Sequence, residues 1–236
     1  MPSKDEALAM AEKAVQALEG FVAEGADGWN KCPVPSMKVN VWRKKSPEWE
    51  HHVYKGECRV KGSMDRLMDM MHPDINYYKH KWDPNVDKGR LLEELSGSVL
   101  KFHSISKHAL GGLITPRESY YIAKLVNKPD HKTIAGVSFE HETDETTKNA
   151  GPPPWERKEE PIVAWGYTSG VHIKPSDQPE KSIVTAIFQS DFKGKIATGA
   201  AEAALPVAIM EWFNALRKTH KLDYEPLKDV PGKKGD

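Results

Sequence analysis

The chain contains 236 residues, enough for one large domain or two small ones. Lysine plus arginine equals aspartate plus glutamate at 34 each, and this zero net charge argues against a nucleic-acid-binding protein, which needs a net basic face. The two cysteines show no CxxC or zinc spacing, the N-terminus has no apolar signal core, and no apolar run is long enough to span a bilayer. We therefore expect a soluble, cytoplasmic protein in a reducing compartment.

The first third of the chain predicts a helix, two strands and a second, short helix. The first helix is predicted over 7–22, where apolar residues recur at helical spacing, and it ends before Gly25 and Gly28. Alternating residues predict half-buried strands at 37–41 and 54–60. Ser63 can cap the short helix, whose apolar face contains Met64, Leu67, Met68 and Met71. We interpret this methionine stripe as adaptable core rather than as a cofactor site.

The middle of the chain is rich in predicted strands. After the turn signal Trp82-Asp83-Pro84-Asn85, four to six strands are predicted over 90–95, 99–105, 119–126, 133–139, 162–174 and 183–190. Residues 107–116 are apolar but broken by Gly111-Gly112, which indicates a mobile loop that is either a core plug or a lid. Residues 141–161 are charged and proline-rich and are interpreted as an exposed loop or short linker.

The last predicted helix runs from Thr198 to His220. Thr198 can cap it, and Pro206 should kink or delay it because proline removes one backbone donor. Its apolar face contains Ala201, Leu205, Ala208, Ile209, Trp212 and Leu216. The pattern alone favours a core helix, and the more specific alternative is a helix gripped by a curved sheet and closing a cavity. The element order predicts an α+β fold with an antiparallel sheet wrapped on a helix.

Sequence motifs for catalysis or metal binding are not apparent. The chain has no GxSxG, HExxH, GxxxxGK[ST] or post-strand GxGxxG motif. Its ten histidines are scattered, and neither the pair His51-His52 nor His72 with His80 has metal-ligand spacing. We therefore predict no catalytic residues, no metal and no cofactor, and binding is favoured over catalysis.

A curved sheet around a helix can enclose an apolar volume for a small hydrophobic ligand. Strand alternation predicts that one face of each of two strands lines this volume, through Leu100, Phe102, Ser104, Ser119, Tyr121 and Ala123. The opposite face would then contain Lys101, His103, Tyr120 and Lys124. A slip of one residue in register would exchange the two faces.

Five segments in order resemble a START domain, the lipid-transfer domain related to the steroidogenic acute regulatory protein. They are 82–86, 113–118, 169–175, 191–194 and the motif Trp212-Phe213-x-x-Leu216-Arg217. The resemblance covers about 28–220 and implies the helix-grip fold, in which a long C-terminal helix roofs an apolar tunnel. It implies one lipid-binding domain over 28–222, with an N-terminal helix over 1–27 packed on it and a flexible tail over 223–236.

The resemblance also implies roles for individual residues. The loop that opens to admit lipid would contain Leu110, Gly111, Gly112, Leu113 and Ile114, and its leucine and isoleucine side chains would then touch a membrane surface. Arg117 and Glu118 would open the next strand as an arginine–acid pair. The tunnel roof would be formed by Leu205, Ile209, Trp212 and Leu216. Further lining residues would be Val86, Trp165, Tyr167, Phe188 and Ser190.

One departure from the family pattern concerns the ligand. The steroidogenic branch holds a sterol hydroxyl with a buried acid and a buried arginine, and those places here contain Ser104 and Ala123. A hydroxyl such as that of Ser104 or Tyr121 would have to replace the ion pair in polar recognition.

The expected function is non-catalytic binding of one hydrophobic lipid, sterol-like, carotenoid or phospholipid, and its transfer between membranes through transient surface contact. A lipid-gated interaction module is the second hypothesis, and an enzyme that uses a helix-grip cavity is the third.

Overall fold

The N-terminal helix is fixed by its own sequence. The computed structural model describes residues 1–25, 27–109, 112, 114–141, 162–194, 198–228 and 230–233. Helix α1 spans Lys4–Ala23. Ser3 caps it: the Ser3 hydroxyl accepts from the Glu6 N–H, and the Glu6 carboxylate accepts from the Ser3 N–H, so two otherwise unpaired donors are satisfied. One side of α1 is buried, as the helical spacing predicts, through Ala7, Ala11, Ala14, Val15, Leu18 and Phe21.

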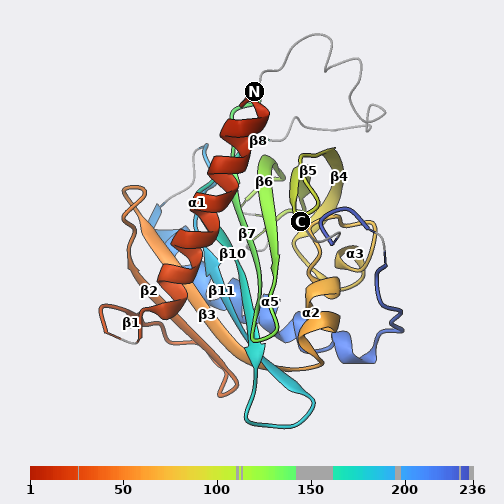
Figure 1. The fold of residues 1–236 in the computed structure, drawn as a ribbon. Helices are drawn as coiled ribbons and strands as arrows, with labels where there is room; N and C mark the ends of the chain where they lie inside the picture. The colour runs from red at the N-terminus through yellow and green to blue at the C-terminus, as the bar shows by residue number, and fades with distance from the viewer. Residues whose placement is uncertain are drawn as a thin grey trace.

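A long antiparallel sheet forms the centre of the molecule (Figure 1). Its strands lie in the order β1-β2-β3-β11-β10-β7-β6-β5-β4. Their bounds are β1 Asn30–Lys31, β2 Val39–Lys45, β3 His52–Lys61, β4 Val86–Glu94, β5 Val99–Ser106, β6 Arg117–Asn127, β7 Lys132–Ser138, β10 Ser169–Pro175 and β11 Lys181–Phe188. Short strand β8 (Ile162–Val163) pairs in parallel with β6, and β9 (Trp165–Gly166) pairs with β12 (Ser190–Asp191).

Two strand predictions need correction. The single strand predicted over 162–174 is three strands, because β8, β9 and β10 pair with different partners: β8 with β6, β9 with β12, and β10 with β7 and β11. The strand predicted over 37–41 begins at Val39, and Met37 is fully exposed. Alternation within one segment cannot show where the chain changes its pairing partner.

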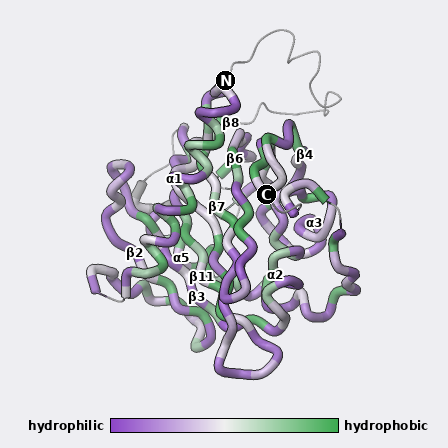
Figure 2. Tube along the Cα trace, viewed as in Figure 1, coloured by the Kyte–Doolittle hydropathy of each residue, from purple (hydrophilic) through white to green (hydrophobic). Residues whose placement is uncertain are grey.

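Helices cover both faces of the sheet. Figure 1 shows α1 crossing one face, while α5 (Thr198–Leu216) lies on the other. Consecutive strand residues accordingly belong to different cores: Ile134 packs in the α5-side core and Ala135 in the α1-side core. Burial on both faces explains the apolar strands and hydrophilic hairpin ends in Figure 2. No helix in the described part of the chain is long and apolar enough to cross a bilayer.

Gly170 permits the close approach of α1 to the sheet. Its φ is +155°, and a Cβ added there would lie 2.0 Å from the Ile134 carbonyl oxygen and 2.7 Å from Leu18 of α1. A larger residue at this position would therefore have to displace a strand backbone as well as the helix.

The chain after the last helix packs against α2 (Met64–Met70). Asp69 is almost fully buried, and its carboxylate accepts hydrogen bonds from the Tyr224 hydroxyl at 2.8 Å and the Leu227 N–H at 3.1 Å, and also from the ammonium of Lys233. The sequence predicts a flexible tail over 223–236, whereas the described residues of this segment make specific contacts. Sequence reasoning could not find them because Asp69 lies about 155 residues from its partner Tyr224.

The methionine-rich face of α2 is core, as predicted. Leu67, Met68 and Met71 belong to the α5-side core, and Met64 packs against it. The short helix α3 (Lys79–Trp82) follows, and the Trp82 indole N–H donates to the Met70 carbonyl at 2.7 Å. The 3₁₀ turn η2 (Thr219–Lys221) then leads from α5 into the C-terminal segment.

His72 makes the packing of this C-terminal segment sensitive to pH. The Asp74 N–H donates to His72 Nδ1 at 3.1 Å, so Nε2 carries the proton of the neutral ring and donates to the Pro231 carbonyl at 2.9 Å. Burial lowers the pKa of His72 from its ordinary value of 6.5. The unfolded chain therefore takes up a proton at a higher pH than the folded chain does.

We expect the free energy of unfolding to fall as the pH drops below about 6.5, because protonation then favours the unfolded state. The variant His72→Gln should lose part of this dependence in urea titrations between about pH 7 and pH 5. The exposed His80→Gln variant is the control and should keep the wild-type slope. Equal slopes for wild type and His72→Gln would contradict the assignment.

Candidate functional site

A cavity of about 390 Å³ lies on the α5 side of the sheet. Its walls come from the segment 71–85, from β5, β6, β7, β10 and β11, from the residues around β9 and β12, and from Trp212 of α5. This volume lies in the lower part of the roughly 300–1,000 Å³ range of small-molecule sites. The cavity is therefore large enough for one compact ligand.

Strand register explains which side chains reach the cavity. Across β5 and β6, Leu100 faces Ala123, Phe102 faces Tyr121 and Ser104 faces Ser119, so these six side chains share one face of the sheet, as predicted. Ser104, Ser119, Tyr121 and Ala123 line the cavity. Leu100 and Phe102 are almost fully buried in the α5-side core, although they are on the same face.

The lining is rich in uncharged hydroxyl groups. It includes Tyr121, Tyr167 and six serines: Ser104, Ser106, Ser119, Ser138, Ser169 and Ser190. Several of these serines bond to backbone groups. Ser138 Oγ accepts from the Gly166 N–H at 2.8 Å, and Ser169 Oγ donates to the Gln189 carbonyl at 3.1 Å.

The Tyr121 phenol is a permanent hydrogen-bond donor. Burial is the main cause that raises its pKa, the carboxylates of Asp74 and Asp83 raise it further, and a hydrogen bond with Ser104 opposes them. The ring is held by stacking on Phe102, with centroids 5.6 Å apart. Tyr121 and Ser104 therefore present a neutral polar pair on the cavity wall.

Trp212 is fixed at the edge of the cavity. Its indole N–H donates to Asp83 Oδ2 at 3.1 Å, and its ring packs edge-to-face on Trp82 and Phe188, with centroids 5.3 and 5.6 Å away. Asp83 is buried and also accepts from the Asn85 N–H at 3.0 Å. The turn 82–85 thus anchors α5, a role that its interpretation as a turn did not reveal.

Arg117 lines the cavity but directs its donors to the protein. The guanidinium donates to the Phe192 and Lys193 carbonyls and, at 2.7 Å each, to the carbonyl and hydroxyl of Thr115. Burial lowers its pKa. Its neighbour Glu118 points elsewhere, because Glu118 Oε1 lies 2.7 Å from His103 Nε2 and accepts from the Tyr120 hydroxyl at 3.0 Å. Arg117 therefore joins two loops at the cavity wall.

Comparison with known proteins identifies the family. The model of the START domain matches residues 9–223. The chain belongs to the START domain family. The match begins within α1. Membership of this family supports lipid binding and lipid transfer.

The relatives of this START domain cover nearly its whole length. StAR-related lipid transfer protein 5 of Bos taurus is 24% identical over 214 residues, which are 90% of this chain and 93% of that protein. StAR-related lipid transfer protein 4 of Homo sapiens is 21% identical and spans 92% of this chain and 99% of its own.

Solved structures confirm the predicted helix-grip fold of the START domain. The structure of human StAR-related lipid transfer protein 5 superposes with a TM-score of 0.80 at 20% identity, over 93% of this chain and 98% of that one. Human STARD10 superposes with a TM-score of 0.66 at 18% identity, over 94% and 82% of the two chains. Each is similar in fold to this chain.

The predicted site residues separate into two groups in this START domain. The structure brings nine of them to the cavity: Ser104, Arg117, Ser119, Tyr121, Ala123, Tyr167, Phe188, Ser190 and Trp212. Val86, at the start of β4, and Trp165, in β9, are outside its lining. Residues that the sequence analysis missed include Ile134, Gly136 and Ser138 of β7, which strand alternation could have found had the β6–β7 pairing been known.

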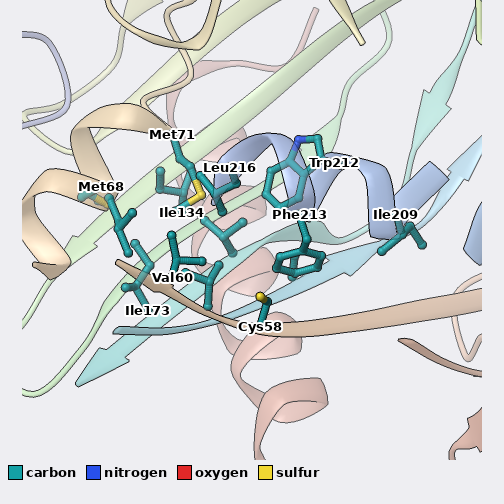
Figure 3. Close-up of a cluster of buried hydrophobic side chains, with 14 of the residues drawn as sticks. Cys58, Val60, Met68, Met71, Ile134, Ile173, Ile209, Trp212, Phe213 and Leu216 are labelled. Carbon is teal, nitrogen blue, oxygen red and sulfur yellow. The ribbon is translucent and has the colours of Figure 1, made fainter. Parts of the chain in front are cut away.

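Of the four predicted roof residues, Trp212 alone lines the cavity. Ile209 and Leu216 belong to the core, and Leu205 lines a separate cavity of about 190 Å³ with Trp49 and His52. The cause is the close packing of α5 on β3, where Phe213 lies between the helix and Cys58 (Figure 3). The part of α5 that is pressed against β3 leaves no room for ligand.

The predicted lid loop is described only in part. Leu110, Gly111 and Leu113 lie outside the described residues, as does 142–161 within the charged, proline-rich segment. Ile114 is almost fully buried and forms a β-bridge with Ala109, while Gly112 has a φ of +94°. Ile114 therefore packs inside the protein in this conformation of the loop.

We expect Arg117→Lys to lower the free energy of unfolding by about 2–3 kcal/mol, because lysine cannot reproduce the forked hydrogen bonds to both loops. Urea denaturation measures this change. Arg59→Lys is the matched control, since Arg59 forms an exposed pair with Asp177, and it should cost less than about 0.5 kcal/mol. Similar losses in the two variants would contradict the role of Arg117.

Proposed function

We propose that this START domain binds one uncharged, sterol-like lipid in its cavity and transfers it between membranes without chemical change. The observation that carries the proposal is the chemistry of the lining: apolar side chains, a neutral Tyr121–Ser104 pair, and buried charges that already have protein partners. Apolar burial would contribute roughly 25 cal/mol per Å² of surface removed from water. One ligand hydroxyl could bond to the Tyr121–Ser104 pair and orient the molecule.

The size and charges of the cavity favour this class over the other two. A volume of about 390 Å³ suits one compact ring system better than two acyl chains or a long polyene. A phospholipid headgroup would need a cation, and the buried guanidinium of Arg117 is occupied by carbonyl and hydroxyl oxygens. Lys79, on α3, remains the other cationic lining residue among those described.

The route of entry is proposed to lie between the loop 107–116 and α5. Trp212 of α5 is held by Asp83, and the loop bears the bridge between Ala109 and Ile114. Opening this bridge would expose Ile114, an apolar side chain that suits transient contact with a membrane surface. Closure of the loop would then shield the bound ligand from water.

The first test is organic extraction of the protein purified from its native source, followed by mass spectrometry and absorbance spectroscopy. We expect a sterol-like lipid at about one molecule per chain, because the cavity accepts one compact ligand. A phosphorus-containing lipid or a polyene would contradict the ligand class while supporting the carrier function. An empty extract after incubation with mixed lipids would contradict both.

The second test addresses polar recognition. Tyr121→Phe should weaken binding of a hydroxylated sterol by about 0.5–1.5 kcal/mol, up to roughly tenfold in Kd, since one hydrogen bond is lost. Fluorescence competition measures this change. The same variant should bind the analogue without the hydroxyl as tightly as wild type does.

Tyr120→Phe is the matched control. Tyr120 lies on β6 on the face of the sheet opposite Tyr121, and its hydroxyl donates to the Glu118 carboxylate on that opposite face. It should leave both affinities unchanged. An equal loss for the two ligands in Tyr121→Phe would show that the phenol does not meet the sterol hydroxyl.

A further inference from the structure

Three potential metal ligands gather on the face of the sheet opposite the cavity. Glu19 is on the C-terminal half of α1, His131 directly precedes β7, and His172 is in the middle of β10. His172 pairs across the strands with Thr133, and its neighbours Val171 and Ile173 pack in the α5-side core. Alternation therefore places His172 on the α1 side. These residues take no part in the lipid site.

The geometry of the three groups matches a metal site. One ring nitrogen of each histidine and one carboxylate oxygen of Glu19 all lie within 4.8 Å of one another. His131 Nε2 is 3.4 Å from Glu19 Oε1, and the two imidazole rings stack with centroids 4.9 Å apart. Ligand atoms about 2.0–2.1 Å from a tetrahedral zinc ion are roughly 3.4 Å from each other. A small side-chain movement would therefore complete the arrangement.

Each histidine has an oxygen partner at Nδ1. His131 Nδ1 is 3.1 Å from Asp130 Oδ1, and His172 Nδ1 is 3.1 Å from Thr133 Oγ1. An oxygen that accepts from Nδ1–H fixes the ring and leaves the Nε2 lone pair for a metal, which is the usual arrangement around metal-binding histidines. Asp130, the residue before His131, thus orients one ring, and Thr133, which pairs with His172 across the strands, orients the other.

Two atoms of the group are buried without a hydrogen bond. Glu19 Oε1 and His131 Nε2 have no hydrogen-bond partner among the described residues, although they are shielded from solvent. His172 completes the group, since one of its ring nitrogens lies within 4.8 Å of the ligand atoms of Glu19 and His131. Glu19 and His131 lie within ion-pair distance of each other, and a shared cation would bring His172 into the same interaction.

We propose that Glu19, His131 and His172 bind one divalent transition-metal ion of the zinc class. Two imidazoles and one carboxylate suit zinc, whereas calcium and magnesium prefer oxygen ligands throughout. The ion would connect α1, the β6–β7 hairpin and β10, which are distant in the sequence. Because only the folded chain assembles these ligands, binding would stabilise the fold.

The test uses the full chain, freed of metal with a chelator and then titrated with Zn²⁺ by calorimetry. We expect one Zn²⁺ per chain and a rise in Tm on zinc addition. His131→Gln and His172→Gln should each weaken binding at least tenfold, because each removes one ligand. Co²⁺ in place of Zn²⁺ should give the visible absorption of a tetrahedral site in wild type and lose it in both variants.

Two further variants keep the test decisive. His220→Gln is the matched control: His220 is exposed on η2 and does not belong to the cluster, so its replacement should leave the affinity for Zn²⁺ unchanged. Glu19→Gln preserves size on the helix surface and should fold, while losing the zinc-induced rise in Tm. Failure of wild type to bind Zn²⁺, or equal affinities of the site variants and His220→Gln, would overturn the proposal.

Discussion

The close contact between α5 and β3 determines where this protein has room for a ligand. A Cβ on Gly56 of β3 would lie 2.3 Å from Phe213 and 3.0 Å from Ile209, so only glycine lets the helix settle this deeply on the strand. Ile209, Phe213 and Leu216 of α5 are consequently core. The free volume lies beside Trp212 and the strands β5, β6, β7 and β10.

Two charged groups at the wall of this volume, Asp83 and Arg117, are already hydrogen-bonded to other parts of the protein. Asp83 accepts from Trp212 and Asn85, and Arg117 donates to the carbonyls of two loops. A buried charge without a partner would be costly, and a buried charge with partners already in place offers little to a ligand. Apart from Lys79 and Asn85, hydroxyl groups therefore make up the remaining polar side chains of the cavity wall, which is why the proposal centres on a neutral lipid.

The two faces of the sheet carry different features. One face, under α5, holds the cavity, and the other, under α1, holds the cluster of Glu19, His131 and His172. A two-residue period allows adjacent residues of β10 to serve both faces, with Val171 at the cavity and His172 in the cluster. Outside the sheet, the C-terminal segment is held to α2 by the buried carboxylate of Asp69.

Local rules in the sequence were sufficient for α1, whose capping box and apolar spacing involve residues at most a few positions apart, and for the shared face of β5 and β6. The resemblance supplied the family and the fold. Only the tertiary structure decided that 162–174 changes partners between strands, that Ile209 and Leu216 are core while Trp212 reaches the cavity, and that the segment after Leu222 docks on Asp69. It also assembled Glu19, His131 and His172, which have no recognisable spacing. The physical reason is the same in each case: strand pairing and helix docking join residues far apart in the chain, and no local periodicity encodes which of them meet.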